Sequence, residues 1–104
     1  MTTTLELVSY TLKNQVLPTD LATVNNAVND FLLQQPGFVY RSCSADDKAV
    51  IFDVVYWQDE QSAKRAGDAF IAHPAGQALI ALCDEHSVEM RQMAVLSSSC
   101  SQSA

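Results

Sequence analysis

Residues 36–66, PGFVYRSCSADDKAVIFDVVYWQDEQSAKRA, decide the fold of this chain. Their residue types predict a turn, a strand over about 38–45, a tight turn at Asp46-Asp47, a strand over 49–57 and the start of a helix. The second of these strands is rich in β-branched and aromatic residues and carries one charge, Asp53. Because it is apolar on both sides, we expect both of its faces to be covered.

Composition limits the classes of protein that remain. The chain has 104 residues, 48% of them hydrophobic, with three Gly and three Pro, which predicts one globular domain. Twelve acidic residues against six basic ones give a net charge of -6. This charge disfavours binding to nucleic acid or to an anionic membrane. With no signal-like or membrane-spanning segment in the sequence, we expect a soluble cytoplasmic protein.

The three cysteines are odd in number and widely spaced, at Cys43, Cys83 and Cys100. This pattern fits reduced thiols. It fits neither a disulfide framework nor a CxxC metal or redox motif. Cys43 lies within a predicted strand with no histidine near it, so we interpret it as a small buried side chain and not as a nucleophile.

Outward from the central stretch, the periodicity predicts four further elements. A first strand covers Leu5 to Leu12, and a helix follows that Thr19 would cap. A second helix would be capped by Asp59 and interrupted at His73-Pro74, where His73 would cap a short continuation over 75–83. A last strand covers 85–96, and a Ser-rich tail, 97–104, is predicted to be disordered.

Two helical faces are expected to pack on the sheet. Spacings of three and four residues define both of them. In the first helix they are Leu21, Val24, Ala27, Val28, Phe31 and Leu32, with Asn25, Asn26, Asn29 and Asp30 largely opposite; in the second they are Ala63, Ala66, Gly67 and Phe70. The element order is therefore βαββαβ, which predicts an α+β, ferredoxin-like domain with an antiparallel sheet over residues 1–96.

The hairpin length predicts which side chains share a face. If Asp46 and Asp47 are the central turn residues, Tyr40 pairs with Asp53 and Phe38 with Val55. One face then carries Phe38, Tyr40, Ser42, Ile51, Asp53, Val55 and Trp57, and the other Val39, Arg41, Cys43, Val50, Phe52, Val54 and Tyr56. A shift by one residue would exchange the two sets of partners.

The element order, the PGF at residues 36–38 and the DVVYWQDEQSAKRA junction together resemble the antibiotic-biosynthesis-monooxygenase-like family, over roughly residues 5–96. The resemblance implies a homodimer whose sheets close into a dimeric α/β barrel, with small-molecule pockets. Activities in the family include cofactor-independent oxygenation of aromatic polyketides, quinol oxygenation and haem degradation. The position matching the haem-ligating histidine lies near Gly67, with no histidine close by, and His73 cannot be carried over. Haem degradation is therefore disfavoured.

Asp53 is the leading candidate for a functional residue. A lone carboxylate in an apolar strand costs free energy unless it is solvated, paired or hydrogen-bonded. In one interpretation it is a catalytic base that takes a proton from a phenol or carbon acid. In the other, which we favour, Tyr40, an arginine such as Arg91 or a hydrated dimer seam compensates the charge. Tyr40, Ser42 and Trp57 are the candidate pocket-lining residues, although an aromatic at a strand end more often seals a core.

The histidines do not predict a metal site. His86 stands beside Asp84 and Glu85, but neighbouring residues on a strand point to opposite faces, so only Asp84 and His86 could converge. We therefore expect no metal and no cofactor.

Two functions follow. The first is a cofactor-independent monooxygenase-like homodimer acting on a small planar phenolic or quinol-like compound. The alternative is a non-catalytic small-molecule-binding or stress-associated dimer of the same fold.

Overall fold

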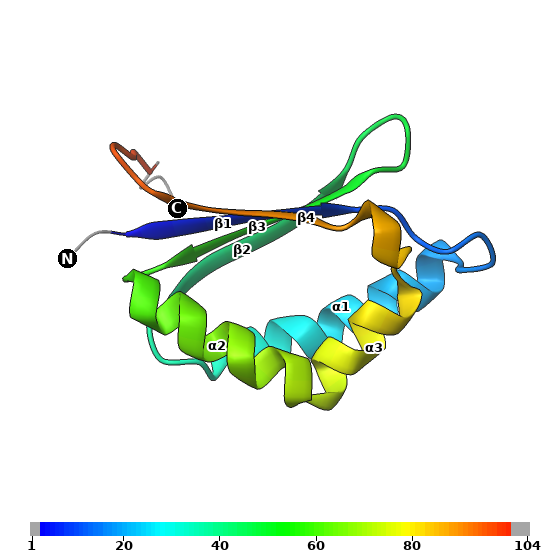
Figure 1. Ribbon diagram of the computed structural model, residues 1–104, viewed down its shortest axis with the longest axis horizontal. Coiled ribbons are helices and arrows are strands. Elements are labelled where there is room, and N and C mark those ends of the chain that lie inside the picture. Colours follow the sequence, from blue (N-terminus) through cyan, green and yellow to red (C-terminus); the bar gives the residue numbers. More distant parts are fainter. Residues whose placement is uncertain (1–2, 101–104) are drawn as a thin grey trace.

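The computed structural model describes residues 3–100, and its four strands form one antiparallel sheet in the order β2-β3-β1-β4. In chain order the elements are β1 (Thr4–Tyr10), α1 (Pro18–Leu33), β2 (Phe38–Ala45), β3 (Ile51–Trp57), α2 (Glu60–Ala72), α3 (Pro74–Leu82), a 3-10 turn (Glu85–Ser87) and β4 (Glu89–Ala94). All three helices lie on one side of the sheet (Figure 1). The α+β, ferredoxin-like prediction is confirmed.

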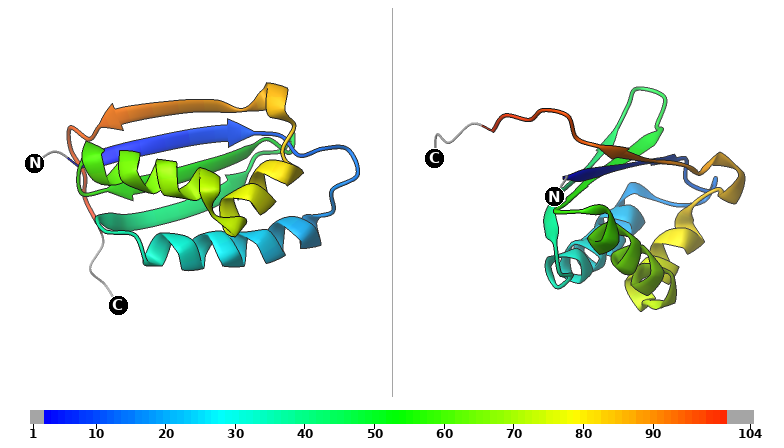
Figure 2. Two further views of the ribbon diagram at one scale, coloured as in Figure 1. Left: turned by 60° about the horizontal axis from the view of Figure 1, so that its bottom comes forward. Right: turned by 60° about the vertical axis from the view of Figure 1, so that its left-hand side comes forward.

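The helices cover the sheet unevenly. Figure 2 shows α1 below the β2 edge and α2 and α3 below the middle of the sheet, while β4 extends beyond them. Every residue of β4 is exposed in this single chain. None of the helices in the described part of the chain is long and apolar enough to cross a membrane.

The helix ends follow local backbone chemistry. Asp59 accepts a hydrogen bond from the Ser62 N–H at 2.8 Å, and His73 Nδ1 accepts one from the Ala75 N–H at 3.0 Å, so both predicted caps are confirmed. The predicted Thr19 cap is wrong. The N-cap is Leu17, two residues earlier, and helix α1 begins at Pro18, because proline suits the first helical position. The Asp20 carboxylate accepts from the Leu17 N–H at 3.0 Å.

Both terminal strands are shorter than predicted. β1 ends at Tyr10, and Leu12 forms only an isolated bridge with Cys83. The last strand begins at Glu89, because Asp84 Oδ1 accepts from the His86 N–H at 3.1 Å and closes a 3-10 turn ahead of it. Residues 97–100 form no helix or strand, and the rest of the predicted tail, 101–104, lies outside the described residues.

The predicted hairpin register is wrong by an odd number of residues. Cys43, and not Tyr40, is the cross-strand partner of Asp53, and the last pair before the loop is Ala45 with Ile51. The loop is longer than a two-residue turn because Asp46 Oδ1 accepts from the N–H groups of Lys48 and Val50, both at 2.9 Å, and because Ala49 takes a positive φ of 64°. An odd shift moves the β2 side chains from Tyr40 onward to the other face.

The helix-facing side of the sheet carries the core. It includes Ile51, Asp53, Val55 and Trp57 of β3, Tyr10 of β1 and, after the register correction, Arg41 and Cys43 of β2. A bulge between Phe38 and Tyr40 returns Phe38 to this side, where its ring meets the Trp57 ring at 5.7 Å and 73°. Gly67, predicted to face inward on α2, is exposed.

Gly76 marks a close crossing of α3 and α2. A Cβ at this position would overlap the backbone carbonyl oxygen of Phe70. We expect Gly76→Ala to lower the free energy of unfolding by about 3 kcal/mol, because the backbone of α2 cannot yield as a side chain can. Urea denaturation measures this loss.

Gly67→Ala is the matched control. No atom lies within 4 Å of a Cβ built there, and alanine is favoured over glycine inside a helix by about 0.5–1 kcal/mol. Equal midpoints for the two variants would contradict the packing argument at Gly76.

Candidate functional site

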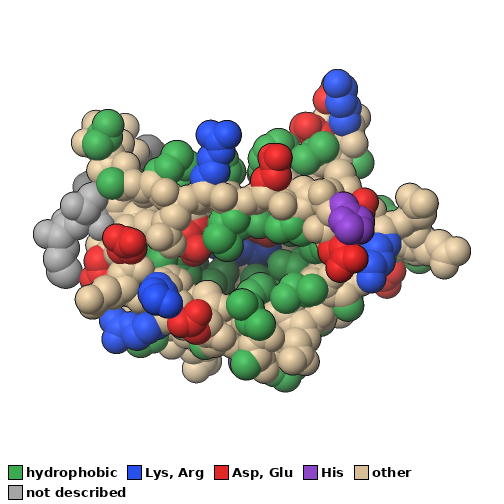
Figure 3. All heavy atoms as spheres, in the orientation of Figure 1, with side chains coloured by type: hydrophobic (Ala, Val, Ile, Leu, Met, Phe, Trp, Pro, Cys, Tyr) green, Lys and Arg blue, Asp and Glu red, His purple; other side chains and the backbone are tan. Residues whose placement is uncertain are grey.

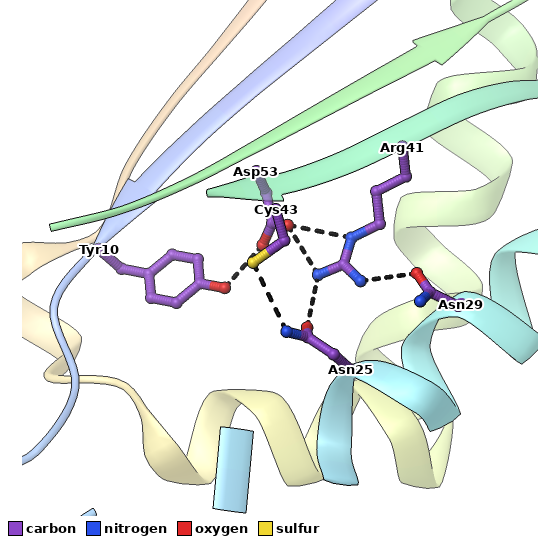
Figure 4. Close-up of polar contacts among 6 residues, drawn as sticks. All are labelled: Tyr10, Asn25, Asn29, Arg41, Cys43 and Asp53. Atoms are coloured by element: carbon purple, nitrogen blue, oxygen red, sulfur yellow. Dashed lines mark hydrogen bonds and ion pairs between the residues drawn. The ribbon is translucent and has the colours of Figure 1, made fainter. Parts of the chain in front are cut away.

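Asp53 lies at the centre of a buried polar cluster that joins three strands to helix α1 (Figure 4). Its side chain points to the helix side, and the residue is 6% exposed. Arg41 Nε and Nη2 approach Asp53 Oδ1 at 3.0 and 2.7 Å, and the Tyr10 hydroxyl donates to Asp53 Oδ2 at 2.7 Å. Both carboxylate oxygens are therefore occupied by donors, from β2 on one side and β1 on the other.

Helix α1 completes the cluster through two asparagines one turn apart. Arg41 Nη2 donates to Asn25 Oδ1 and Arg41 Nη1 to Asn29 Oδ1, each at 2.8 Å. The Arg41 side chain is only 4% exposed. Asp53 balances its charge, and the two asparagine amide oxygens accept hydrogen bonds from its other N–H groups. The cluster thus holds α1 on the sheet by directional contacts as well as by apolar packing.

The buried carboxylate acts on the groups around it. The pKa of Tyr10 is strongly raised, first by burial and then by the negative charge of Asp53, so the phenol stays protonated and remains a hydrogen-bond donor. Burial and, next, Asp53 also raise the pKa of the Cys43 thiol, whose sulfur accepts from Asn25 Nδ2 at 3.6 Å. Because a thiolate is disfavoured here, Cys43 is unsuited to act as a nucleophile, in agreement with the sequence prediction.

Cys83 is a second buried thiol with no reactive character. Its sulfur donates to the Leu79 carbonyl at 3.2 Å, and burial, more than the nearby Asp53, raises its pKa to about 11. Cys83 therefore belongs to the core beneath the sheet.

A second carboxylate lies on the same side of the sheet. Glu6 of β1 accepts a hydrogen bond from Trp57 Nε1 at 2.6 Å and is also hydrogen-bonded to Gln92 of β4. Burial raises the pKa of Glu6, and these two hydrogen bonds oppose that shift only in part. No salt bridge joins Glu6 to a Lys or Arg among residues 3–100.

An open groove lies beside Gln92, the cross-strand neighbour of this second carboxylate. It has a volume of about 540 Å³ and lies between the start of α2 and the β1–β4 edge. Its lining includes Gln92, the neighbour of Glu6, together with Thr4 and Ala94 on the same side of the sheet. Figure 3 shows this face hollowed between the sheet and the helices, with hydrophobic side chains around the opening and a Lys or Arg side chain at its base.

The structure brings together some of the predicted site residues and separates others. Asp53 and Trp57 share the helix-facing side of β3 and are both buried. Tyr40 and Ser42 lie on the opposite face, where Tyr40 is 54% exposed and its ring faces Tyr56 at 6.2 Å. The prediction that they share a face with Asp53 is wrong, because it depended on the two-residue turn; a pocket for them on their own face stays a prediction.

The partners of Asp53 were not found from the sequence. The interpretation that side chains of the fold compensate its charge is confirmed, but the alternatives named were Tyr40, an arginine such as Arg91 or a hydrated seam, and the partners are Arg41 and Tyr10 together. Asn25 and Asn29 were placed opposite the buried stripe and instead contact Arg41. Two asparagines four residues apart inside a helix were an available indication, because asparagine is a weak helix former.

His86 lies in the 3-10 turn ahead of β4 and not on the strand where the sequence placed it. Asp84 accepts from the backbone N–H of His86, and the His86 ring is exposed beside Glu85. Within residues 3–100 no three His, Cys, Asp or Glu side chains converge as metal ligands would.

Known proteins similar to this chain were found by structure. No family model and no curated protein matches its sequence. SnoaB, a cofactor-independent oxygenase from Streptomyces nogalater, superposes with a TM-score of 0.75 at 19% identity, over 94% of this chain and 97% of that one. A candidate antibiotic biosynthesis monooxygenase from Chloroflexus aurantiacus gives 0.65 at 14% identity, with the same coverage.

The chain has the ferredoxin-like fold of these oxygenase-like proteins. A dimeric ferredoxin-like protein of unknown function from Thermobifida fusca also matches, with a TM-score of 0.68 at 14% identity over 90% of this chain and 92% of that one. At these identities the similarity establishes the fold, and the chemistry has to be argued from the site.

Proposed function

We propose that this protein is a cofactor-independent monooxygenase-like homodimer that acts on a small planar phenolic or quinol-like compound. One observation carries the proposal. On the helix-facing side of the sheet, two buried aromatic side chains each donate a hydrogen bond to a carboxylate, Tyr10 to the buried Asp53 and Trp57 to the half-buried Glu6. This pairing lies within the fold of a known cofactor-independent oxygenase. A planar ligand that enters from the β4 side would approach the half-buried Glu6, which the buried Trp57 ring holds in place.

The proposed chemistry needs a base and oxygen only. Removal of the phenolic proton leaves an electron-rich ring carbon that forms a C–O bond with O₂. The resulting hydroperoxide then loses water, so a phenol and O₂ give a quinone and H₂O. The protein's part is to hold the ring, accept the proton and exclude bulk water.

In this proposal Asp53 orients Tyr10 and balances Arg41. Both of its oxygens already accept hydrogen bonds, which favours a positioning role for it. The direct proton acceptance predicted for Asp53 from the sequence stays a prediction. Trp57 is buried and is proposed to fix the Glu6 carboxylate through its indole N–H; the pocket-lining role predicted for Trp57 from the sequence stays a prediction.

Oxygen uptake tests the function. We expect the protein to consume oxygen with a planar phenol such as 1-naphthol or an anthrone, and Tyr10→Phe to lower the rate at least about tenfold, because it removes the hydroxyl that Asp53 holds. Tyr40→Phe is the matched control, since its hydroxyl is on the opposite face. Absence of uptake with every phenol and quinol tried would contradict the proposal.

The alternative of a non-catalytic binding dimer has one observation in its favour. Among the described residues, every buried polar side-chain atom has a hydrogen-bond partner, so the Asp53 cluster is complete without a ligand. Ligand binding without oxygen uptake would select this alternative.

A further inference from the structure

The two carboxylates on the helix-facing side of the sheet differ in the charge of their partners. Asp53 is ion-paired with Arg41 at 2.7 Å and hydrogen-bonded to Tyr10, so a proton arriving there would break a buried charge pair. Glu6 is held by two uncharged donors, Trp57 and Gln92. Protonation of Glu6 would therefore break no ion pair with a Lys or Arg of residues 3–100.

The positions of the two carboxylates also differ. Asp53 is 6% exposed and lies under α1, whereas Glu6 is half-buried on β1 and its cross-strand neighbour Gln92 lines the open groove. Helices α2 and α3 leave β4 uncovered (Figure 2), and Glu6 lies on β1, the strand paired with β4. Trp57 is buried, at 2% exposed, and its hydrogen bond fixes the Glu6 carboxylate from the core side.

We propose that the Glu6 carboxylate, and not that of Asp53, accepts the proton of a phenolic ligand that enters from the β4 side of the molecule. This inference rests on the proposed function. The phenol O–H bond breaks, its proton passes to Glu6 and its electron pair stays on the phenolate. When O₂ adds to the ring carbon, the proton returns from Glu6 to the terminal peroxide oxygen, which restores the Glu6 carboxylate. The hydrogen on the same ring carbon is then lost as the O–O bond breaks, so that water leaves and the ring carbon becomes a quinone carbonyl.

The groups around Glu6 are consistent with a base at this position. The raised pKa of Glu6, caused mainly by burial, brings its conjugate acid closer to the range in which a carboxylate can take and return a proton. Its neighbours on β3 and β4, Trp57 and Gln92, carry no charge. The charged groups on the remaining elements near the groove are Asp59, Glu60 and Arg65 of α2, with Asp53 paired to Arg41 further along the sheet.

The raised pKa of Glu6 also determines how the stability of the protein changes with pH. Because folding raises the pKa of Glu6, the folded state binds more protons than the unfolded state between the two pKa values, and stability falls as pH rises through that interval. At neutral pH the ionised Glu6 therefore reduces stability. We expect Glu6→Gln to be at least as stable as the wild type, so its effects on binding do not arise from unfolding.

The first test uses Trp57 as a reporter. It is the single tryptophan of the chain, so intrinsic fluorescence reports on the indole that donates to Glu6. We expect the emission to titrate with a midpoint above the ordinary pKa of glutamate, and Glu6→Gln to abolish that step. Glu89→Gln, on the opposite face of β4, should retain it. If Glu6→Gln showed the same pH-dependent change in Trp57 emission, the assignment of that titration to Glu6 would be overturned.

The second test measures ligand binding without turnover. By calorimetry under anaerobic conditions, we expect 1-naphthol to bind Glu6→Gln about tenfold more weakly than the wild type, because a charged acceptor is lost. Binding of 1-methoxynaphthalene, which has the same rings and no proton to donate, should not change. Equal loss for both ligands, or loss for neither, would overturn the inference.

The outcomes separate this inference from the proposed function. If oxygen uptake fails while Glu6→Gln still removes the fluorescence step and selectively weakens 1-naphthol binding, Glu6 is the proton acceptor of a binding site and the oxygenase function falls. If oxygen uptake occurs and Glu6→Gln leaves its rate and pH profile unchanged, the function stands and the inference is wrong. If both hold, Glu6→Gln should lower kcat at least about a hundredfold.

Discussion

Replacing Asp53 by asparagine is expected to lower the free energy of unfolding by about 3–5 kcal/mol, because the Arg41 guanidinium would keep its charge in a buried site without a counter-ion. Tyr10 would also lose the charged acceptor of the hydrogen bond that its hydroxyl donates to Asp53 Oδ2 at 2.7 Å. Urea denaturation followed by circular dichroism measures the change. Asp68→Asn is the matched control, since it makes the same substitution in the exposed Lys64–Asp68 pair, where we expect less than about 0.5 kcal/mol.

A double variant distinguishes loss of a partner from loss of packing. Arg41→Met combined with Asp53→Leu removes both charges and keeps apolar volume on the helix-facing side of the sheet. We expect it to recover most of the stability lost in Asp53→Asn, because the unpaired charge causes most of the loss. If Asp53→Asn were as stable as the wild type, the ion pair would not stabilise the fold, and this result would favour the catalytic interpretation of Asp53.

The second large effect is expected at the bare face of the sheet. With all helices on one side, the other side of the described sheet is uncovered in the single chain (Figure 1). Half-buried apolar residues of the central strands line it, namely Leu5, Leu7, Phe52, Val54 and Tyr56. An apolar sheet face of this kind requires a cover, and we propose that a second copy of the chain supplies it.

Lysine at the centre of this face should separate the copies. We expect the wild type to be a dimer in native mass spectrometry and Val54→Lys to weaken the dimer by about 2–4 kcal/mol, or roughly thirty- to a thousandfold in Kd, because a charge would be buried without a partner. The variant should still fold, since this side chain reaches solvent in the monomer. Ala69→Lys, on the exposed side of α2, should leave the dimer intact. A monomeric wild type at micromolar concentration would contradict the proposal.

Local patterns were sufficient for the architecture. The βαββαβ order, the caps at Asp59 and His73 and the break between α2 and α3 all depend on residues close in sequence, and each is confirmed. Periodicity of 2 and of 3.6 residues is a local property, so element order survives without knowledge of the fold. The strand ends were less certain, because Thr11, Leu12 and Ser87 take contacts from segments distant in sequence.

The partners of Asp53 in the candidate site, in contrast, depend on contacts between distant segments. The sequence indicated that Asp53 needs compensation, because any buried carboxylate does, and that both faces of its strand need a cover. Which residues compensate it depended on the hairpin register, and Asp46, through two backbone hydrogen bonds, lengthened the loop and exchanged the faces of β2.

No sequence pattern indicated Glu6 as a candidate functional residue. Its environment comes from Trp57, 51 residues away, and from Gln92 on another strand. Burial and hydrogen bonding of a carboxylate are properties of three-dimensional packing, so the identity of the buried carboxylates and their partners emerges only when the strands are assembled.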